Sequence, residues 1–295
     1  MIDVLILGAS GLVGNTFHRL VSPTKKVVGT YFSRPKQGLS FLDITDADSL
    51  RWALASWRPR VVIHAACNTH VDGCERDQEE AHRVNVVGTE NIARACQAGG
   101  AKLVFFSTDY IFDGRAGPYS EEDEPQPINY YGLTKLEGER AITSKLESFL
   151  VLRTHGVFGW EEPASNFVLR LIANSGEGKV ARVPSDQFGT PTAAVNLADM
   201  AWRLIVGDKS GIYNLAGSDF LDRYSFSLMI AEVFGLDKSL IVAEKTRALG
   251  QAAPRPLRAG LRVDKIRTEL GDTVWSARQG LERLKAELEA RHWQP

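Results

Sequence analysis

The amino-acid sequence predicts an α/β protein, with a doubly wound parallel sheet followed by a smaller mixed α/β lobe. In the first half, short apolar runs alternate with longer amphipathic stretches, the pattern of parallel strands joined by crossover helices. After residue 160 this alternation loosens into helical stretches and short strands. We therefore expect one domain over residues 1–160 and a second lobe over 161–295, with later segments able to return to the sheet.

The expected elements follow from apolar runs, periodicity and breakers. Strands are expected over residues 2–7, 26–30, 61–64, 102–106 and 149–153, and helices over 12–20, 46–57, 77–98 and 129–146. Pro59 stops the second helix, and the Gly- and Pro-rich stretch 113–127 is a loop. In the second half we expect helices near 167–174, 193–206, 224–234 and 276–291, and strands near 180–183 and 212–215.

Composition narrows the class of protein. With 295 residues and a formal net charge of -1, the chain has no global basic field to attract nucleic acid or a membrane surface. No apolar stretch is long enough to span a bilayer, and the N-terminus lacks the features of a signal peptide. Cys67, Cys74 and Cys96 are sparse and odd in number, which favours a reducing, cytoplasmic location.

A glycine-rich turn separates the first strand from the first helix. Its spacing is G-x-x-G-x-x-G, and it assigns cofactor-binding roles to Gly8, Ser10, Gly11, Leu12, Val13 and Gly14. Glycines at such a turn permit the tight bend, the approach of a diphosphate and close helix–strand packing, while the helix N-terminus offers free N–H groups. The alternative is a structural turn without a ligand. The strand before it and the helix after it favour a Rossmann-like dinucleotide-binding domain.

The end of the second strand indicates which dinucleotide binds. A site for NAD usually has an acidic residue here, which holds the ribose 2′-hydroxyl. This chain instead has Ser33 and Arg34, which can pair with the 2′-phosphate of NADP. The sequence therefore predicts a preference for NADPH over NADH. The alternative for Arg34 is a solvated turn residue.

A Y-x-x-x-K pattern opens the helix expected near residue 129. Tyr131 and Lys135 are four residues apart and share a helix face, so we expect the ammonium to lower the pKa of the phenol. Tyr130 lies off that face. Thr108, at the carboxyl end of a strand, can hydrogen-bond a substrate carbonyl. These residues make a candidate catalytic set, the alternatives being a packed tyrosine and a strand-end threonine.

Several further segments coincide with those of a known family. They are F-L-D-I-T-D at 41–46, A-A-C-N-T-H-V-D at 65–72, N-V-V-G-T at 85–89, S-T-D-Y-I-F-D-G at 107–114, D-Q-F-G-T-P-T at 186–192 and R-P at 255–256. Over nearly the whole chain they resemble the dTDP-4-dehydrorhamnose reductase family of the extended short-chain dehydrogenases/reductases. The resemblance implies a cofactor domain, a small nucleotide-sugar lobe and an oxidoreductase of dTDP-rhamnose and polysaccharide biosynthesis, which reduces the 4-keto group of a nucleotide-linked 6-deoxy-sugar.

The resemblance also assigns residues. Tyr131 would protonate the alkoxide, with Lys135 and Thr108 in support. Cofactor-contacting positions match Gly11, Leu12, Val13, Asp43, Ile44, Ala65, Ala66 and Asn85, and substrate-side positions match Thr69, Val71, Asp109, Tyr110, Gln187 and Arg255. The implied cofactor is NADP(H), with NAD(H) as a second possibility. Mg²⁺ and a homodimer are suggested by the family resemblance alone.

One departure concerns the sugar. The segment 152–159 reads L-R-T-H-G-V-F-G, and Gly156 stands where the family usually has a tryptophan that covers the sugar. His70 also replaces a small residue common in its loop. These changes put the identity of the sugar in question more than the chemistry.

Three other interpretations stay open. The set His64, Cys67, His70 and Cys74 resembles zinc-ligand spacing, but facing alternates along a strand, so we expect no metal site. The same family pattern includes the regulatory beta subunit of methionine adenosyltransferase, which would bind NADP without reducing a sugar. A sugar-nucleotide epimerase or dehydratase is the third, although Asp109-Tyr110 departs from the Asp-Glu pair of the dehydratases.

Overall fold

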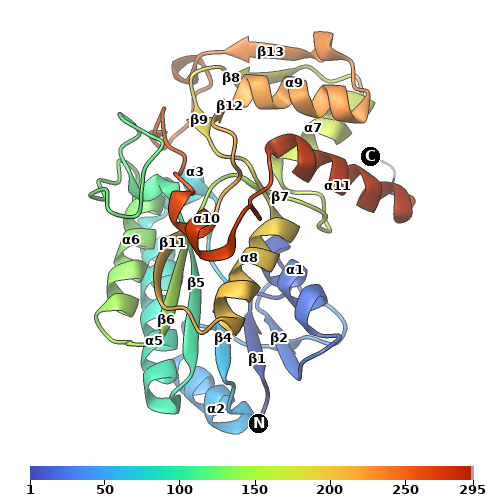
Figure 1. Ribbon diagram of the computed structural model, residues 1–295. Helices are drawn as coiled ribbons and strands as arrows, with labels where there is room; N and C mark the ends of the chain where they lie inside the picture. The colour runs from blue at the N-terminus through green and yellow to red at the C-terminus, as the bar shows by residue number, and fades with distance from the viewer. Residues whose placement is uncertain (294–295) are drawn as a thin grey trace.

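The computed structural model describes residues 1–293, and its centre is a seven-stranded parallel sheet (Figure 1). From one edge to the other its strands are β11 (Gly211–Asn214), β6 (Phe149–Thr154), β5 (Lys102–Thr108), β4 (Val61–His64), β1 (Val4–Leu7), β2 (Val27–Tyr31) and β3 (Ser40–Phe41). The strand order reverses between β1 and β4, which pair in parallel from Val4↔Val61 to Leu7↔His64. A ligand crevice is expected at the carboxyl ends of strands on either side of such a reversal.

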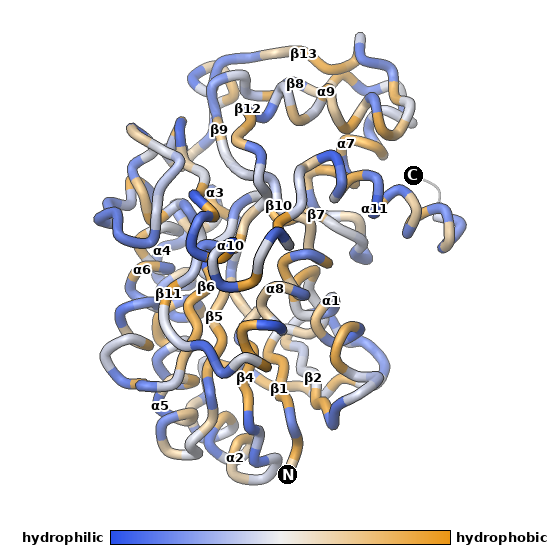
Figure 2. The backbone as a smooth tube through the Cα atoms, viewed as in Figure 1, coloured by the Kyte–Doolittle hydropathy of each residue, from blue (hydrophilic) through white to orange (hydrophobic). Residues whose placement is uncertain are grey.

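Helices cover both faces of this sheet. They are α1 (Leu12–Val21), α8 (Ala194–Val206) and α10 (Asp264–Leu270) on one face, and α2 (Ala47–Trp57), α5 (Gly88–Gly99) and α6 (Tyr130–Thr143) on the other. Each face has its own apolar core, one around Phe17 and Leu197 and the other around Leu50 and Ile92. Figure 2 shows the corresponding apolar strands between helices with polar outer surfaces. The predicted doubly wound sheet is confirmed.

A smaller lobe lies above the carboxyl ends of the strands (Figure 1). It contains α7 (Phe167–Gly176), α9 (Arg223–Phe234), α11 (Ala277–Ala290) and the paired strands β8 (Ala181–Pro184) and β13 (Ile241–Glu244). Two further short strand pairs lie outside the main sheet: β7 (Val157–Phe158) with β10 (Thr192–Ala193), and β9 (Phe188–Gly189) with β12 (Leu221–Asp222). A third apolar cluster, which includes Phe158, Ile230 and Leu281, forms its core.

The two lobes are not separated by one cut in the chain. After residue 160 the chain returns to the first lobe, where β11 becomes an edge strand of the sheet and α8 packs against α1. Within the described residues, no helix has the length and apolarity needed to cross a membrane.

The helix expected over 77–98 is confirmed, because the backbone stays helical from Gln78 to Gly99, and it contains one π-helical turn. Asp77 caps a short helix, α4 (Gln78–His82), a π-helical turn follows at Arg83–Val87, and α5 then begins at Gly88. A further helix, α3 (Val71–Arg76), precedes it and was not expected. Asn85 lies in this π turn, and its side chain hydrogen-bonds to the main chain of Asn68 in the loop after β4.

Candidate active site

A crevice of about 1050 Å³ lies between the two lobes, above the carboxyl ends of the parallel strands. Most of the site residues expected from sequence line it: Gly8, Ser10, Gly11, Leu12, Val13, Ser33, Arg34, Asp43, Ile44, Ala65, Ala66, Thr69, Val71, Thr108, Asp109, Tyr110, Tyr131, Lys135, Gln187 and Arg255. They come from turns far apart in sequence, and the sheet topology brings them to one edge.

The glycine turn is built for close backbone approach. Gly8 has φ +81°, and a Cβ there would come within 2.7 Å of the Ala66 nitrogen. Gly11 is the N-cap of α1 and supplies no side-chain hydrogen bond, so the first N–H groups of the helix stay open toward the crevice. The backbone at this turn therefore fits a diphosphate group.

The cofactor side of the crevice continues along neighbouring turns. Exposed Ser33 and Arg34 line it beyond β2, where the sequence has no acidic residue. Asp43 also lines the crevice, and its carboxylate accepts hydrogen bonds from the backbone and hydroxyl of Thr45 at 2.8 Å each. A cation next to an open wall of the crevice fits a phosphate better than a bare ribose hydroxyl.

Two expected cofactor residues do not line the crevice. Gly14 is buried, and a Cβ there would collide with the Gly8 carbonyl oxygen, so this glycine permits helix–strand packing. Asn85 is 2% exposed, and its side chain holds the main chain of Asn68 from both sides at 2.8 and 3.1 Å. The same amide also donates to the Thr134 hydroxyl at 3.1 Å. Asn85 thus fixes the loop after β4 to the helix that carries Tyr131.

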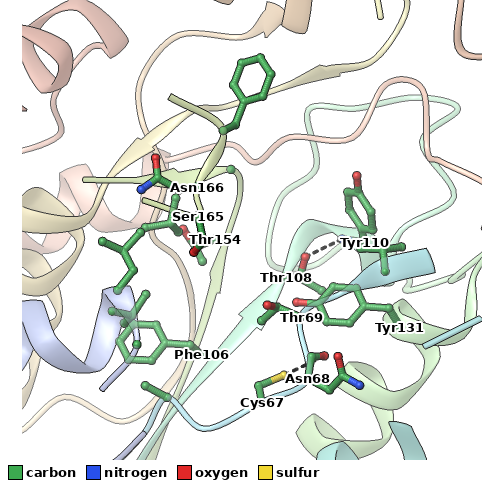
Figure 3. A pocket seen from close by; sticks show the side chains of 18 of the residues that line it. Cys67, Asn68, Thr69, Phe106, Thr108, Tyr110, Tyr131, Thr154, Ser165 and Asn166 are labelled. Carbon is green, nitrogen blue, oxygen red and sulfur yellow. Dashed lines mark hydrogen bonds between the residues drawn. The ribbon is translucent and has the colours of Figure 1, made fainter. Parts of the chain in front are cut away.

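The candidate catalytic residues converge in the middle of the crevice. Figure 3 shows the oxygens of Thr108, Thr69 and Tyr131 directed toward one another, with Tyr110 beyond them. Thr108 ends β5, which is two residues longer than expected, and its hydroxyl accepts the Tyr110 N–H at 3.2 Å. Asn129 caps α6 through the Gly132 N–H at 2.8 Å, which sets the first turn of the helix and with it Tyr131.

The expected effect of Lys135 on Tyr131 is wrong for this arrangement. Burial raises the pKa of Tyr131 well above its ordinary value, although hydrogen bonding with Thr108 opposes the shift. The Lys135 ammonium lies elsewhere, 3.5 Å from the Cys67 sulfur and 4.0 Å from the centre of the Phe105 ring. Tyr131 is therefore protonated at neutral pH, as a proton donor must be.

The substrate-side residues belong to several segments. Tyr110 packs edge-on against Tyr131 with ring centres 6.1 Å apart. Gln187 donates to Thr246 and Gln251, at 3.1 and 2.8 Å. Arg255 lines the crevice and forms an ion pair of 2.9 Å with Asp72 of α3. This ion pair connects the segment that carries Arg255 to α3.

Sequence reasoning missed some lining residues. Arg170, Arg182 and Arg223 come from the second lobe, and no local pattern distinguishes them from surface arginines. Arg223 stacks its guanidinium 4.4 Å from the Phe167 ring centre, and burial lowers its pKa. His155 follows β6 and bonds to Asp109 at 2.6 Å, a contact that the unusual T-H-G sequence could have suggested.

The zinc-like set does not converge. His64 bonds to the Thr89 hydroxyl at 3.0 Å, and burial, with Lys135 nearby, lowers its pKa to about 3. The Cys67 thiol faces the Asn85 side chain, and the Cys74 thiol faces the Asn68 carbonyl. Over residues 1–293, no cluster of three or more His, Cys, Asp or Glu side chains is arranged to hold a metal ion.

Comparison with known proteins agrees with this geometry. The model of the RmlD substrate binding domain family matches residues 2–290. The chain belongs to this family. A dTDP-4-dehydrorhamnose reductase from Aggregatibacter actinomycetemcomitans is 31% identical over 98% of this chain and 100% of its own. The beta subunit of methionine adenosyltransferase 2 from Xenopus tropicalis is 32% identical over 89% of this chain and 80% of its own.

A solved structure matches the fold closely. The dTDP-4-dehydrorhamnose reductase of Bacillus anthracis, solved in complex with NADP, superposes with a TM-score of 0.90 at 30% identity. The match covers 97% of this chain and 99% of that one. Family and fold are thus as the sequence motifs predicted.

Proposed function

We propose that this protein is an NADPH-dependent reductase of the 4-keto group of a nucleotide-linked 6-deoxy-sugar, of the dTDP-4-dehydrorhamnose reductase type. The observation that carries the proposal is that Thr108, Tyr131 and Lys135 line one crevice together with the glycine turn at Gly8 and Gly11. Figure 3 shows the oxygens of Thr108 and Tyr131 directed toward each other there. A reductase needs a dinucleotide site and a proton donor at one sheet edge, and this crevice provides both.

The residues present fit a dinucleotide phosphate. The turn from Gly8 to Val13 would hold its diphosphate, and Ser33 and Arg34 its 2′-phosphate. When bound, NADPH supplies the hydride, and the lack of an acid after β2 leaves NADH as the weaker partner. Lys135 is 3% exposed and lines the crevice beside Cys67, where a ribose hydroxyl would find an ammonium donor.

The polar groups of the site then handle the substrate oxygen. The single Thr108 O–H donates to Asp109 Oδ1 at 3.3 Å here, and with substrate bound it would turn to the 4-keto oxygen and orient the carbonyl. Tyr131, protonated at neutral pH, gives its proton to the alkoxide that forms. Asn85 keeps the loop after β4 and the Tyr131 helix in register, so that both oxygens face the same point.

We assign the dinucleotide to residues 1–160 and the nucleotide sugar mainly to residues 161–295. Support comes from the positions of the arginines: Arg170, Arg182 and Arg223 line the crevice from the second lobe, opposite the glycine turn. Guanidinium groups on a crevice wall suit the diphosphate of a nucleotide sugar. The free thiols Cys67, Cys74 and Cys96 support a cytoplasmic location. The homodimer stays a prediction, as does the exclusion of an epimerase or dehydratase.

A second candidate function has a specific observation in its favour. Methionine adenosyltransferase beta subunits are as similar in sequence to this chain as the reductases are. A regulatory subunit would bind NADPH and reduce no keto-sugar. The presence of Thr108, Tyr131 and Lys135 in the lining of one crevice favours the enzyme.

The deciding experiment follows NADPH oxidation with dTDP-4-dehydro-6-deoxy-L-mannose as substrate, beside a Tyr131→Phe control. We expect turnover by the wild type and a loss of roughly 10²–10⁴-fold in kcat for Tyr131→Phe, the range for removal of a general acid. The folded control should still bind NADPH. Tight NADPH binding without turnover by the wild type would instead favour the regulatory function.

A further inference from the structure

A carboxylate–imidazole pair lies next to the candidate catalytic residues. The parallel register of β5 and β6 places Thr108 opposite Thr154. The next residue on each strand, Asp109 and His155, therefore emerges at the same edge of the sheet, and the two side chains meet there. The proposed reduction gives no role to Asp109 or His155.

The pair has a fixed orientation. Asp109 is 1% exposed, and its Oδ2 accepts hydrogen bonds from His155 Nδ1 at 2.6 Å and from the Gly260 N–H at 2.9 Å. A buried carboxylate that bonds Nδ1 keeps a proton on that nitrogen, so the neutral form of the ring presents its lone pair at Nε2. The imidazole of His155 is thus prepared as a hydrogen-bond acceptor.

The surroundings of the ring leave this acceptor open to a ligand. His155 lines the crevice, and its Nε2 has no hydrogen-bond partner among the described residues. The atom is not one of the fully buried, unpartnered polar atoms of these residues. Gly189 packs over the face of the His155 ring, and any side chain at that position would collide with the ring. Beside it, exposed Gly156 leaves open space, since a Cβ there would have only the Pro191 Cα within 4 Å, at 3.9 Å.

From this geometry we infer that His155, held by Asp109, is a specificity-determining residue that accepts a hydrogen bond from a hydroxyl group on the sugar ring. The inference rests on the proposed function, which places the sugar next to Thr108 and Tyr131. The Thr108 hydroxyl donates to Asp109 Oδ1 at 3.3 Å. The groups that would bind the keto oxygen and the recognised hydroxyl are therefore neighbours. A sugar with a methyl ether or a hydrogen at that position would leave Nε2 unpaired.

The test measures binding, so it does not depend on turnover. Titration calorimetry would compare dTDP, dTDP-L-rhamnose and its 2-deoxy and 3-deoxy analogues on the wild type and on His155→Asn. The asparagine amide can still donate to Asp109, so it preserves the pair's support while it removes the acceptor at Nε2. His82→Ala, which removes an exposed ring on α4 outside the crevice, is the matched control.

We expect His155→Asn to lose about tenfold in affinity for dTDP-L-rhamnose, the effect of one unpaired hydrogen-bonding group, and nothing for dTDP. One deoxy analogue should bind both proteins equally, which identifies the hydroxyl. Equal affinity of the two proteins for every ligand would overturn the assignment, and so would an equal loss for all ligands, dTDP included, because that would indicate a structural role. A wild type that binds no dTDP ligand would overturn the proposed function and this assignment together, whereas the first two outcomes leave the proposed function intact.

Discussion

The two sides of the crevice are built in different ways. The cofactor side consists of short turns that directly follow β1, β2 and β4, and its main feature is an accessible backbone at Gly8 and Gly11. The sugar side is assembled from side chains of distant segments, such as His155, Gln187, Arg223 and Arg255. A backbone site depends on the fit of a few glycines, whereas a side-chain site can change its ligand by single substitutions.

This difference explains why one family can hold proteins with different named roles. The reductases and the methionine adenosyltransferase beta subunits are similarly close to this chain. A site made of backbone turns can keep a dinucleotide while side chains on the opposite wall change. We therefore expect substitutions on the two sides to separate cofactor binding from substrate binding.

The largest effect is expected at the glycine that packs the helix against the turn. Gly14→Ala puts a Cβ onto the Gly8 carbonyl oxygen, which is backbone and cannot rotate away. Overpacking of this kind costs about 3 kcal/mol, and it should weaken NADPH binding as the turn opens. Urea denaturation gives the change in the free energy of unfolding, and fluorescence titration gives the Kd for NADPH.

The matched control for this change is Gly99→Ala. Gly99 ends α5 with nothing within 4 Å of an added Cβ, and alanine favours helices by up to about 1 kcal/mol. It should leave the protein equally or slightly more stable. If Gly14→Ala were as well tolerated as Gly99→Ala, the close packing of helix and turn would not be needed.

Most residues predicted for the cofactor side lie together in the structure because the signals that indicated them are local. The Gly8–Gly14 turn, the missing acid near Arg34 and the Tyr131–Lys135 spacing each lie within one turn or one helix, and the structure places their side chains in or beside the crevice. The unusual T-H-G sequence could draw attention to His155, but its contact with Asp109 depends on the register of two strands, which the sequence does not give. The cofactor role expected for Asn85 became a supporting one because a π turn buries the side chain.

A second substitution tests the sugar side. Arg223 lines the crevice from the start of α9, stacked on Phe167, and its charge is expected to hold the diphosphate of the nucleotide sugar. Arg223→Leu should lower kcat/KM for the sugar about 30-fold, the effect of a lost charge-assisted hydrogen bond, with the Kd for NADPH unchanged. Steady-state kinetics and NADPH titration measure the two quantities.

Arg203→Leu serves as its control, because Arg203 is half-exposed on α8, pairs with Asp199 and lies outside the crevice. It should change neither quantity. A loss of NADPH affinity in Arg223→Leu would mean that the two walls of the crevice are not independent.

The smallest effect is expected at Arg34, and it tests the cofactor side through a side chain. Arg34→Ala should weaken NADPH binding about tenfold and leave NADH binding unchanged, because only NADPH carries the 2′-phosphate that the guanidinium would hold. The difference should shrink at high salt, since Arg34 is exposed and its field is screened. Lys36→Ala, two residues further along the same turn and outside the crevice, is the control for charge alone. If the wild type used both cofactors with equal efficiency, Arg34 would be a solvated turn residue, and the cofactor side would bind the dinucleotide through its backbone without selecting for the 2′-phosphate.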